Sequence, residues 1–139
     1  MEAEAVLWRV RVAVLWVAMA VCMSATVISV IVTPGNTLMQ GEMEGGPITT
    51  ELLLFASLFW LVPLAMAVLT LALADTAARW TNAVVGIVAA VMWGSELPAA
   101  VIDGTPFSVE MLMSVVAVLI GLLIAWHAWK WPVTTESVA

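Results

Sequence analysis

The chain has 139 residues, 64% of them hydrophobic and 10% charged, with a formal net charge of −6 and a mean hydropathy of +1.13. A water-soluble domain of this length needs more polar surface than this composition supplies, so we expect an integral membrane protein. A nucleic-acid ligand is disfavoured, because the four Lys and Arg residues form no basic stripe that would neutralise phosphates.

Four long apolar segments account for most of the chain, at about residues 6–32, 51–74, 80–102 and 107–131. A helix needs about 20 mostly apolar residues to cross about 30 Å of hydrocarbon, and each segment is long enough. We expect one all-α domain over residues 1–139, an antiparallel up-and-down four-helix bundle in a membrane. The first segment exceeds the apolar core of a signal peptide, which has about 7–15 residues, so we expect it to be retained.

All four basic residues fall on one side of this four-crossing topology. Arg9 and Arg11 flank the start of the first segment, Arg79 lies in the connection between the second and third, and Lys130 closes the fourth. The positive-inside rule makes this side cytoplasmic. We therefore predict a multi-pass protein of the plasma membrane (a bacterial inner membrane), with both termini in the cytoplasm.

The connection over residues 33–50 is the longest non-apolar stretch and would face outward. We expect a short interfacial turn of helix within residues 36–43. Thr49 or Thr50 is expected to cap the second helix, with Glu51 in its first turn, where the helix dipole favours an acid.

The other two connections, residues 75–79 and 103–106, are short. Consecutive helices should therefore be antiparallel neighbours. Pro63 predicts a kink within the second helix, because proline lacks the amide hydrogen that the helix needs there.

Glu96 is the acid that most suggests chemistry, because it stands inside the third apolar segment, where an ionisable group is costly. It would lie about 24 Å along the helix from Trp80, close to the outer interface. Two interpretations stay open: the helix unwinds around Pro98 and Glu96 is hydrated, or Glu96 binds a ligand or a cation. Further acids on the outer side would form an acidic rim with it, but they lack the spacing of a cation-binding loop, so we expect no metal site. These acids are Glu42, Glu44, Glu51, Asp103 and Glu110.

Tryptophan is frequent, with eight residues in the chain. Five are expected to form an aromatic belt at the inner boundary: Trp8, Trp80, Trp126, Trp129 and Trp131. Trp16, Trp60 and Trp93 lie deeper, and two interpretations stay open for them. They line a pocket for a lipid, quinone or pigment, or they pack against neighbouring helices and acyl chains. Together with Glu96 they are our candidate ligand-binding residues.

Small residues in the third and fourth segments predict close helix packing, either within the bundle or against another subunit. They are Gly86, Ala90 and Gly94 in the third segment, and Ser114, Gly121 and Ala125 in the fourth.

The residues needed for catalysis or for a cofactor are scarce. The single histidine, His127, cannot form a two-histidine haem site or a zinc site, and the single cysteine, Cys22, cannot form a disulfide or a CxxC pair. We expect no catalytic residues, no cofactor and no enzyme activity, with a quinone-linked redox role left open. Cys22 is expected to be a small buried apolar residue, and His127 part of the membrane anchor.

Five short motifs follow one another along the chain. They are Pro34-Gly35, Gly45–Thr50 leading into Leu52-Leu53-Leu54, Pro63, Arg79-Trp80-Thr81-Asn82, and Ala128-Trp129-Lys130-Trp131-Pro132. In this order the chain resembles a family of small bacterial four-helix membrane proteins of unknown function, and more loosely the DoxX-like four-helix group. The resemblance covers nearly the whole chain and implies the same fold and topology, but no established activity.

The resemblance also implies a difference. Related members often carry one acid just before the proline of the second helix and another inside the fourth. Here the two places have Trp60-Leu61-Val62-Pro63 and Met113-Ser114-Val115-Val116, without an acid. Proton or redox chemistry by such acids is therefore not expected of this chain.

We expect a non-catalytic integral membrane protein that acts as an accessory or interaction subunit, or binds an apolar ligand between its helices. Its partners would be the lipid bilayer and either further copies of itself or the subunits of a larger membrane complex. The alternative is a small oligomeric transporter or ion-conducting protein, with Glu96 and the outer acids at its entrance. A quinone-linked redox reaction is a third hypothesis, by analogy with the DoxX-like group.

Overall fold

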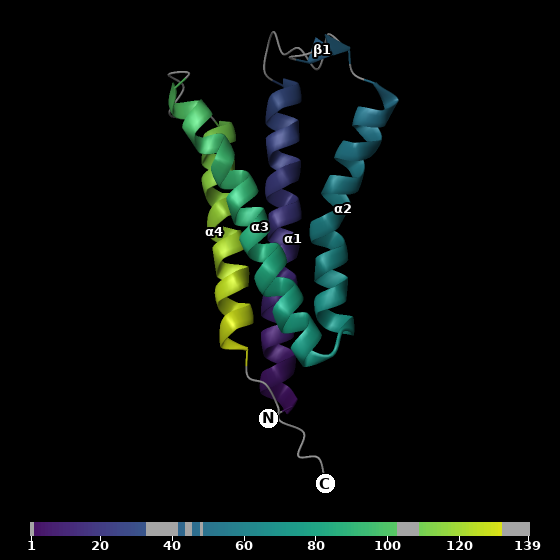
Figure 1. Cartoon of the computed structure of the whole chain (residues 1–139), viewed down its shortest axis with the longest axis vertical. Helices are drawn as coiled ribbons and strands as arrows, with labels where there is room; N and C mark the ends of the chain where they lie inside the picture. Colours follow the sequence, from purple (N-terminus) through teal and green to yellow (C-terminus); the bar gives the residue numbers. More distant parts are fainter. Residues whose placement is uncertain (1, 33–41, 44–45, 48, 103–108, 132–139) are drawn as a thin grey trace.

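The computed structural model describes residues 2–32, 42–43, 46–47, 49–102 and 109–131 of the chain, and within its helices the side chains of Glu96 and Glu110 are outside this description. It contains four helices: α1 (Glu2–Val32), α2 (Thr50–Ala72), α3 (Asp75–Ile102) and α4 (Val109–Lys130). Two short strands, β1 (Glu42–Met43) and β2 (Gly46–Pro47), pair antiparallel at one end of the molecule (Figure 1). The predicted all-α fold with four helices is confirmed.

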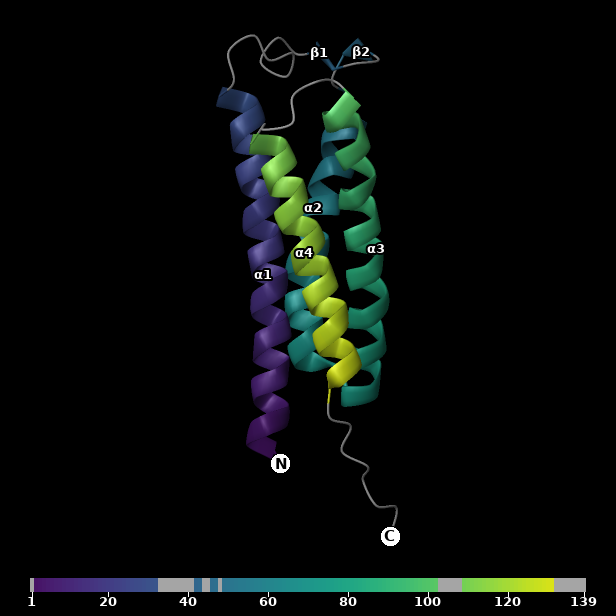
Figure 2. The same cartoon turned by 90° about the vertical axis from the view of Figure 1, so that its left-hand side faces the viewer.

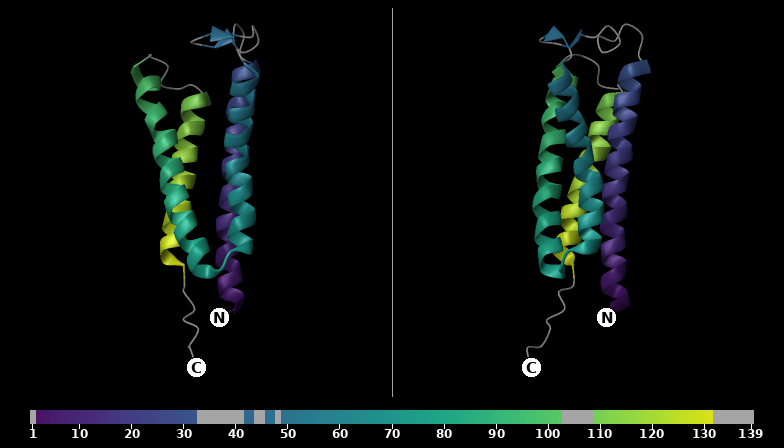
Figure 3. Two further views of the ribbon diagram at one scale, coloured as in Figure 1. Left: turned by 45° about the vertical axis from the view of Figure 1, so that its right-hand side comes forward. Right: turned by 90° about the vertical axis from the view of Figure 1, so that its right-hand side faces the viewer.

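The helices run alternately up and down, as predicted. α1 packs against both α2 and α4, α4 packs against α3, and α2 meets α3 at few positions. Figure 2 shows α4 between α1 and α3. In the left panel of Figure 3, α2 and α3 meet where the chain turns from one to the other, and they diverge toward the far end.

The turn between α2 and α3 is shorter than predicted. Residues 75–79 are the first turns of α3 and not a connection, so Arg79 lies in a helix. Asp75 stands in the first turn, where an acid is favoured, and alanines at 77 and 78 are strong helix formers. The Ala78 amide already donates to the Ala74 carbonyl at 2.8 Å.

Two further local predictions are wrong. α3 continues through Pro98 to Ile102, so the helix does not unwind around that proline. Glu42 and Met43 form β1 and not a turn of helix; the rest of the segment predicted to be helical, residues 36–41, lies outside the described residues.

The start of α1, the turn between α2 and α3, and the end of α4 lie at the same end of the bundle (Figure 1). We call this the basic end, because it carries all four basic residues: Arg9, Arg11, Arg79 and Lys130. The prediction that these residues share one side of the bundle is therefore confirmed for the molecule itself.

α3 and α4 approach closely through the predicted small residues. A Cβ added to Gly121 would lie 2.9 Å from the Gly86 carbonyl oxygen and 3.0 Å from the Ala90 amide nitrogen. At Gly94, by contrast, an added Cβ would meet only Val118 Cγ2, at an ordinary 3.8 Å. The small residues near the middle of both helices therefore serve the packing of this bundle.

Polar and apolar side chains are distributed in an unusual way. Asn82 and Thr70 are fully buried, whereas large apolar side chains are exposed along all four helices. Val21 of α1, Val68 of α2 and Val91 of α3 are 62%, 66% and 65% exposed. Pro63 lies inside α2. In the half of α2 that follows this proline, Thr70 forms a hydrogen bond with Asn82 of α3.

Candidate functional site

A buried hydrogen-bond network joins α1, α2 and α3 near the basic end. The indole Nε1–H of Trp16 donates to Asn82 Oδ1 at 2.6 Å, and the Thr70 hydroxyl lies 2.9 Å from the same oxygen. The Thr70 hydroxyl also lies 2.6 Å from the Met66 carbonyl, and Asn82 Nδ2 donates to the Ala78 carbonyl at 2.7 Å. Each buried polar side chain of the network therefore has a partner, as burial requires.

Sequence reasoning missed this network. Asn82 was noticed only as part of a motif, and Thr70 was not singled out at all. One signal was available: an Asn and a Thr twelve positions apart flank a tight helix turn, and both lie in otherwise apolar segments. A polar side chain inside such a segment needs a partner on a neighbouring helix.

A second polar cluster closes the basic end, centred on Arg9. Its Nη2 lies 2.6 Å from Asp75 Oδ1, at the start of α3, and its Nε donates to the same oxygen at 3.2 Å. Its Nη1 donates to the carbonyls of Leu71 and Leu73, at 3.0 and 2.8 Å. Leu71 lies in the last turn of α2 and Leu73 directly follows the helix, so Arg9 caps the end of α2 while it pairs with α3.

Trp131 completes this cluster from the end of α4. The Arg9 guanidinium carbon lies 5.8 Å from the centre of the Trp131 ring, and the ring is only 2% exposed. The sequence analysis placed Trp131 in an exposed aromatic belt, and this prediction is wrong because the residue is buried. The guanidinium of Arg9 draws it inward, because a cation is attracted to the face of an indole ring.

The other tryptophans at the basic end do lie at the surface. Trp80, Trp126 and Trp129 are each more than half exposed, as expected for a belt. Trp8 is partly covered, because its ring packs against His127 of α4, with 5.4 Å between the ring centres.

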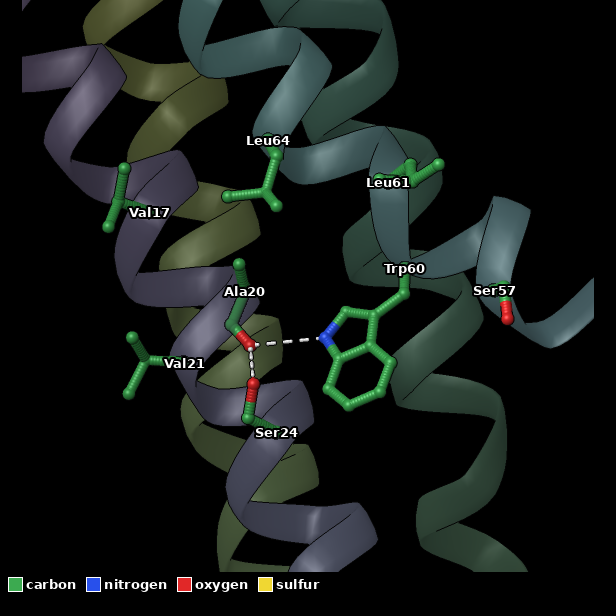
Figure 4. A pocket seen from close by; sticks show the side chains of 8 residues that line it. All are labelled: Val17, Ala20, Val21, Ser24, Ser57, Trp60, Leu61 and Leu64. Carbon is green, nitrogen blue, oxygen red and sulfur yellow. Dashed lines mark hydrogen bonds between the residues drawn. The ribbon is translucent and has the colours of Figure 1, made fainter.

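Trp60, one of the candidate ligand-binding residues, lines a groove between α1 and α2 (Figure 4). Its volume is about 490 Å³, and it is open to the surface. In Figure 4, Trp60 and Leu64 reach from α2 toward α1. The Trp60 Nε1 lies 3.5 Å from the Ala20 carbonyl oxygen, which also accepts a 2.8 Å hydrogen bond from Ser24 Oγ. The lining is mostly apolar, with two serines: Val17, Ala20, Val21, Ser24, Ser57, Trp60, Leu61 and Leu64.

A smaller cavity of about 70 Å³ lies between α1, α2 and α3. Trp16 and Trp93 line it, together with Pro63 and apolar side chains from all three helices. It occupies the region where α2 and α3 diverge. At Trp16 it adjoins the Asn82 network, so this network fixes the ring that forms one wall.

The three deeper tryptophans thus line two different cavities, and neither cavity is lined by Glu96, the fourth candidate residue, among the described residues. Trp60 belongs to the groove, and Trp16 and Trp93 belong to the smaller cavity. Glu96 lies in α3, but its side chain is outside the described residues. Of the acids predicted to form an outer rim, Glu51 stands in the first turn of α2. Glu44 and Asp103 lie outside the described residues, and so do the side chains of Glu42 in β1 and Glu110 in α4.

Among the residues that the structure describes, no three His, Cys, Asp or Glu side chains converge as metal ligands would. Cys22 is buried as predicted, and its Sγ donates to the Met113 carbonyl at 3.3 Å. His127 Nδ1 lies 2.8 Å from the Leu123 carbonyl, which makes Nδ1 the protonated nitrogen that donates. Neither residue has a nucleophile or a base as its partner in these contacts.

Comparison with protein-family models, with curated protein sequences and with solved structures gave no match. The resemblance to small four-helix membrane proteins and to the DoxX-like group therefore stays a prediction.

Proposed function

We propose that the chain is a four-span membrane protein that binds an apolar ligand, the acyl chain of a lipid, in the groove between α1 and α2. The proposal has two parts, and each has its own support. The first is the placement of the bundle in a membrane, and the second is the occupant of the groove.

Two helices, α1 and α4, contain stretches long and apolar enough to cross a membrane, at Glu4–Ile28 and Met111–Lys130. The core helix of a soluble protein is also apolar, but it is mostly buried. Only 39% of the apolar stretch of α1 and 28% of that of α4 are buried in the bundle. With 23 and 28 residues, α2 and α3 are also long enough for about 30 Å of hydrocarbon.

The placement in a membrane rests mainly on one observation: large apolar side chains are exposed on all four helices, whereas the polar Asn82 and Thr70 are buried. In water, exposed Val and Leu on every helix would cost free energy, whereas lipid removes that cost. The buried Asn82 and Thr70 satisfy each other inside the bundle, as a polar side chain in hydrocarbon must. The positive-inside rule then puts the basic end in the cytoplasm.

Cysteine labelling tests the topology. In a Cys22→Ala background, Thr49→Cys marks the end opposite the basic end, and Thr76→Cys marks the basic end; both positions are exposed. We expect a membrane-impermeant maleimide to label position 49 on intact cells and position 76 only after permeabilisation. The reverse pattern would refute the orientation, and extraction of the protein by alkaline carbonate would refute the placement in the membrane.

The groove supports the second part of the proposal. Its volume of about 490 Å³ falls within the range of small-molecule sites, about 300–1,000 Å³. Its apolar walls suit a hydrocarbon chain, and it opens sideways onto the surface that would face the bilayer. No catalytic group is needed for binding, which agrees with the expected non-catalytic role as a ligand-binding or accessory subunit.

A matched pair of serine variants tests the occupant. Ser24 lines the groove, and Ser95 lies on the exposed surface of α3; each hydroxyl donates to a carbonyl of its own helix, at 2.8 and 2.7 Å. Ser24→Phe should fill the groove, whereas Ser95→Phe should leave it open. The probe is a phosphatidylcholine with a photoreactive diazirine on its acyl chain, in vesicles that contain the purified protein.

We expect photoadducts to concentrate on residues 17–24 and 57–64 and to fall several-fold in Ser24→Phe but not in Ser95→Phe. Adducts spread evenly over the exposed faces of all four helices would refute a discrete site. The alternative from the sequence, a transporter with an acidic entrance, depends on acids whose side chains lie mostly outside the described residues, and it stays a prediction.

A further inference from the structure

Each of the four basic residues lies over a different tryptophan ring. Arg9 is over Trp131 at 5.8 Å and Arg79 over Trp129 at 5.9 Å. Arg11 is over Trp8 at 5.5 Å and Lys130 over Trp126 at 5.2 Å. The repetition shows that cations and indoles are arranged together around the basic end, but the four pairs differ in what else they contact.

Arg9 and Arg79 are only partly exposed, so their charges are less accessible than those of the other two basic residues. The charge of Arg9 is compensated by Asp75, and its remaining donors bind backbone carbonyls. Arg79 of α3 is partly covered and lies against the ring of Trp129 on α4.

Arg11 and Lys130 are both exposed, and among the described residues neither forms an ion pair with an acidic side chain as Arg9 does with Asp75. Arg11 lies over Trp8 of its own helix α1, and Lys130 lies over Trp126 of its own helix α4. Trp8 of α1 and His127 of α4 pack against each other in the seam between these two helices, with 5.4 Å between ring centres. Arg11 is one helical turn from Trp8, and Lys130 is one turn from His127.

The chemistry of this seam suits a phosphate group attached to an apolar body. Two cations supply charge-assisted donors for phosphate oxygens. The hydrogen bond from His127 Nδ1 to the Leu123 carbonyl holds the imidazole ring in place against Trp8. Trp126 is 59% exposed beside Lys130, and an exposed indole at this level packs against the glycerol region of a lipid.

We propose that the α1–α4 seam at the basic end, formed by Arg11, Trp8, His127, Lys130 and Trp126, binds the phosphate headgroup of an anionic phospholipid. The inference rests on the proposed placement in a membrane, but not on a ligand in the groove between α1 and α2. The seam lies at the end that the positive-inside rule places in the cytoplasmic leaflet, where anionic lipids supply the negative surface charge.

Lipid binding by the full-length protein tests the site. The protein is purified in a neutral detergent, phosphatidylglycerol or phosphatidylcholine is added, and bound lipid is counted by native mass spectrometry. The seam variants are Arg11→Gln and Lys130→Gln, and the matched control is Arg79→Gln, which also removes a cation that lies over a tryptophan. Arg11→Lys keeps the charge and should retain most of the binding.

Surface electrostatics alone predicts about a fivefold loss for any one cation, wherever it lies at this end. Direct charge-assisted hydrogen bonds in a discrete site predict about a tenfold or greater loss. We therefore expect one tightly bound phosphatidylglycerol, a loss of at least about tenfold in each seam variant, and at most about fivefold in Arg79→Gln.

Three results would overturn the inference. They are equal losses in all three glutamine variants, equal binding of phosphatidylcholine, and displacement of the lipid by soluble glycerol phosphate at a concentration comparable to that of the lipid. The last result would assign the seam to a soluble phosphate ester. If phosphatidylglycerol preference is absent while the protein resists carbonate extraction, only this inference fails; if the protein is extracted, the placement in the membrane fails as well.

Discussion

Substitution of Asn82 by leucine should destabilise the bundle through a single unpaired donor. Asn82 is fully buried, and its Oδ1 accepts the Trp16 indole N–H at 2.6 Å. Leucine has a similar volume but no acceptor, so the indole N–H would stay buried without a partner. Thr70 would lose less, because its hydroxyl can still donate to the Met66 carbonyl at 2.6 Å.

The magnitude follows from these contacts. An unsatisfied buried donor costs about 1–3 kcal/mol. Interhelical hydrogen bonds within membranes average about 0.6 kcal/mol and reach about 1.7 kcal/mol, because the unfolded chain finds other partners. The short 2.6 Å bond and full burial favour the upper part of that range, so we expect Asn82→Leu to lower the unfolding free energy by about 1–2 kcal/mol.

A double-mutant cycle isolates the hydrogen bond. Trp16→Phe removes the indole N–H, and in that background Asn82→Leu no longer strands a donor. Unfolding is followed by circular dichroism as SDS replaces a mild detergent. We expect a coupling of about 0.6–1.7 kcal/mol between the two substitutions. Additive effects within about 0.3 kcal/mol would show that the bond contributes nothing to stability, and the reasoning from burial would then be wrong.

Three further predictions concern packing, the basic end and local stability. Gly121→Ala should cost about 1–3 kcal/mol of unfolding free energy, because its Cβ would lie 2.9 Å from a backbone oxygen of α3, whereas Gly94→Ala should be neutral or slightly stabilising. Arg9→Gln should cost about 1.5–3 kcal/mol by uncapping α2 and removing the ion pair with Asp75, whereas Arg79→Gln should cost less than about 1 kcal/mol. In hydrogen exchange, amides of residues 50–62 in α2 should exchange faster than those of residues 64–72, because only the latter half has α3 as a close neighbour.

Each of these predictions has a clear contrary outcome. Equal effects of alanine at the two glycines would mean that α3 and α4 yield without cost. Rescue by Arg9→Lys would mean that charge alone matters, since lysine cannot reproduce the fork that reaches both Asp75 and the α2 carbonyls. Uniform protection along α2 would mean that its contact with α1 alone holds the first half.

The number of helices and their alternating direction could be predicted because they depend on segment length and apolar content, which any sequence displays. The shared end of the four basic residues follows from the same count. The boundary of α3 could not be predicted from apolar content, because Asp75 and the alanines after it are helical without being part of the apolar core. There, local helix propensity and the acid at the helix start decided the outcome.

The candidate site was predicted only in part. That Trp16, Trp60 and Trp93 border cavities could be anticipated from large side chains deep in apolar segments, but their division between two cavities depends on how α2 leans (Figure 1). The Asn82 network and the Arg9 cluster each join residues more than sixty positions apart. Such pairing depends on the rotation of each helix about its axis, which a single sequence with apolar residues on every face does not specify.

The polar contacts explain why both cavities border α2. The Arg9 cluster and the Asn82 network hold α2 to α1 and α3 at its end, near the turn. Toward Thr50, α3 diverges from α2 (Figure 3), and α2 as a whole packs mainly against α1. Apolar contacts between helices in lipid are easily exchanged for contacts with acyl chains, since both are equally apolar. A hydrocarbon chain can therefore occupy the groove beside Trp60 without breaking a hydrogen bond of the two polar clusters, which is the physical reason to expect the acyl chain there.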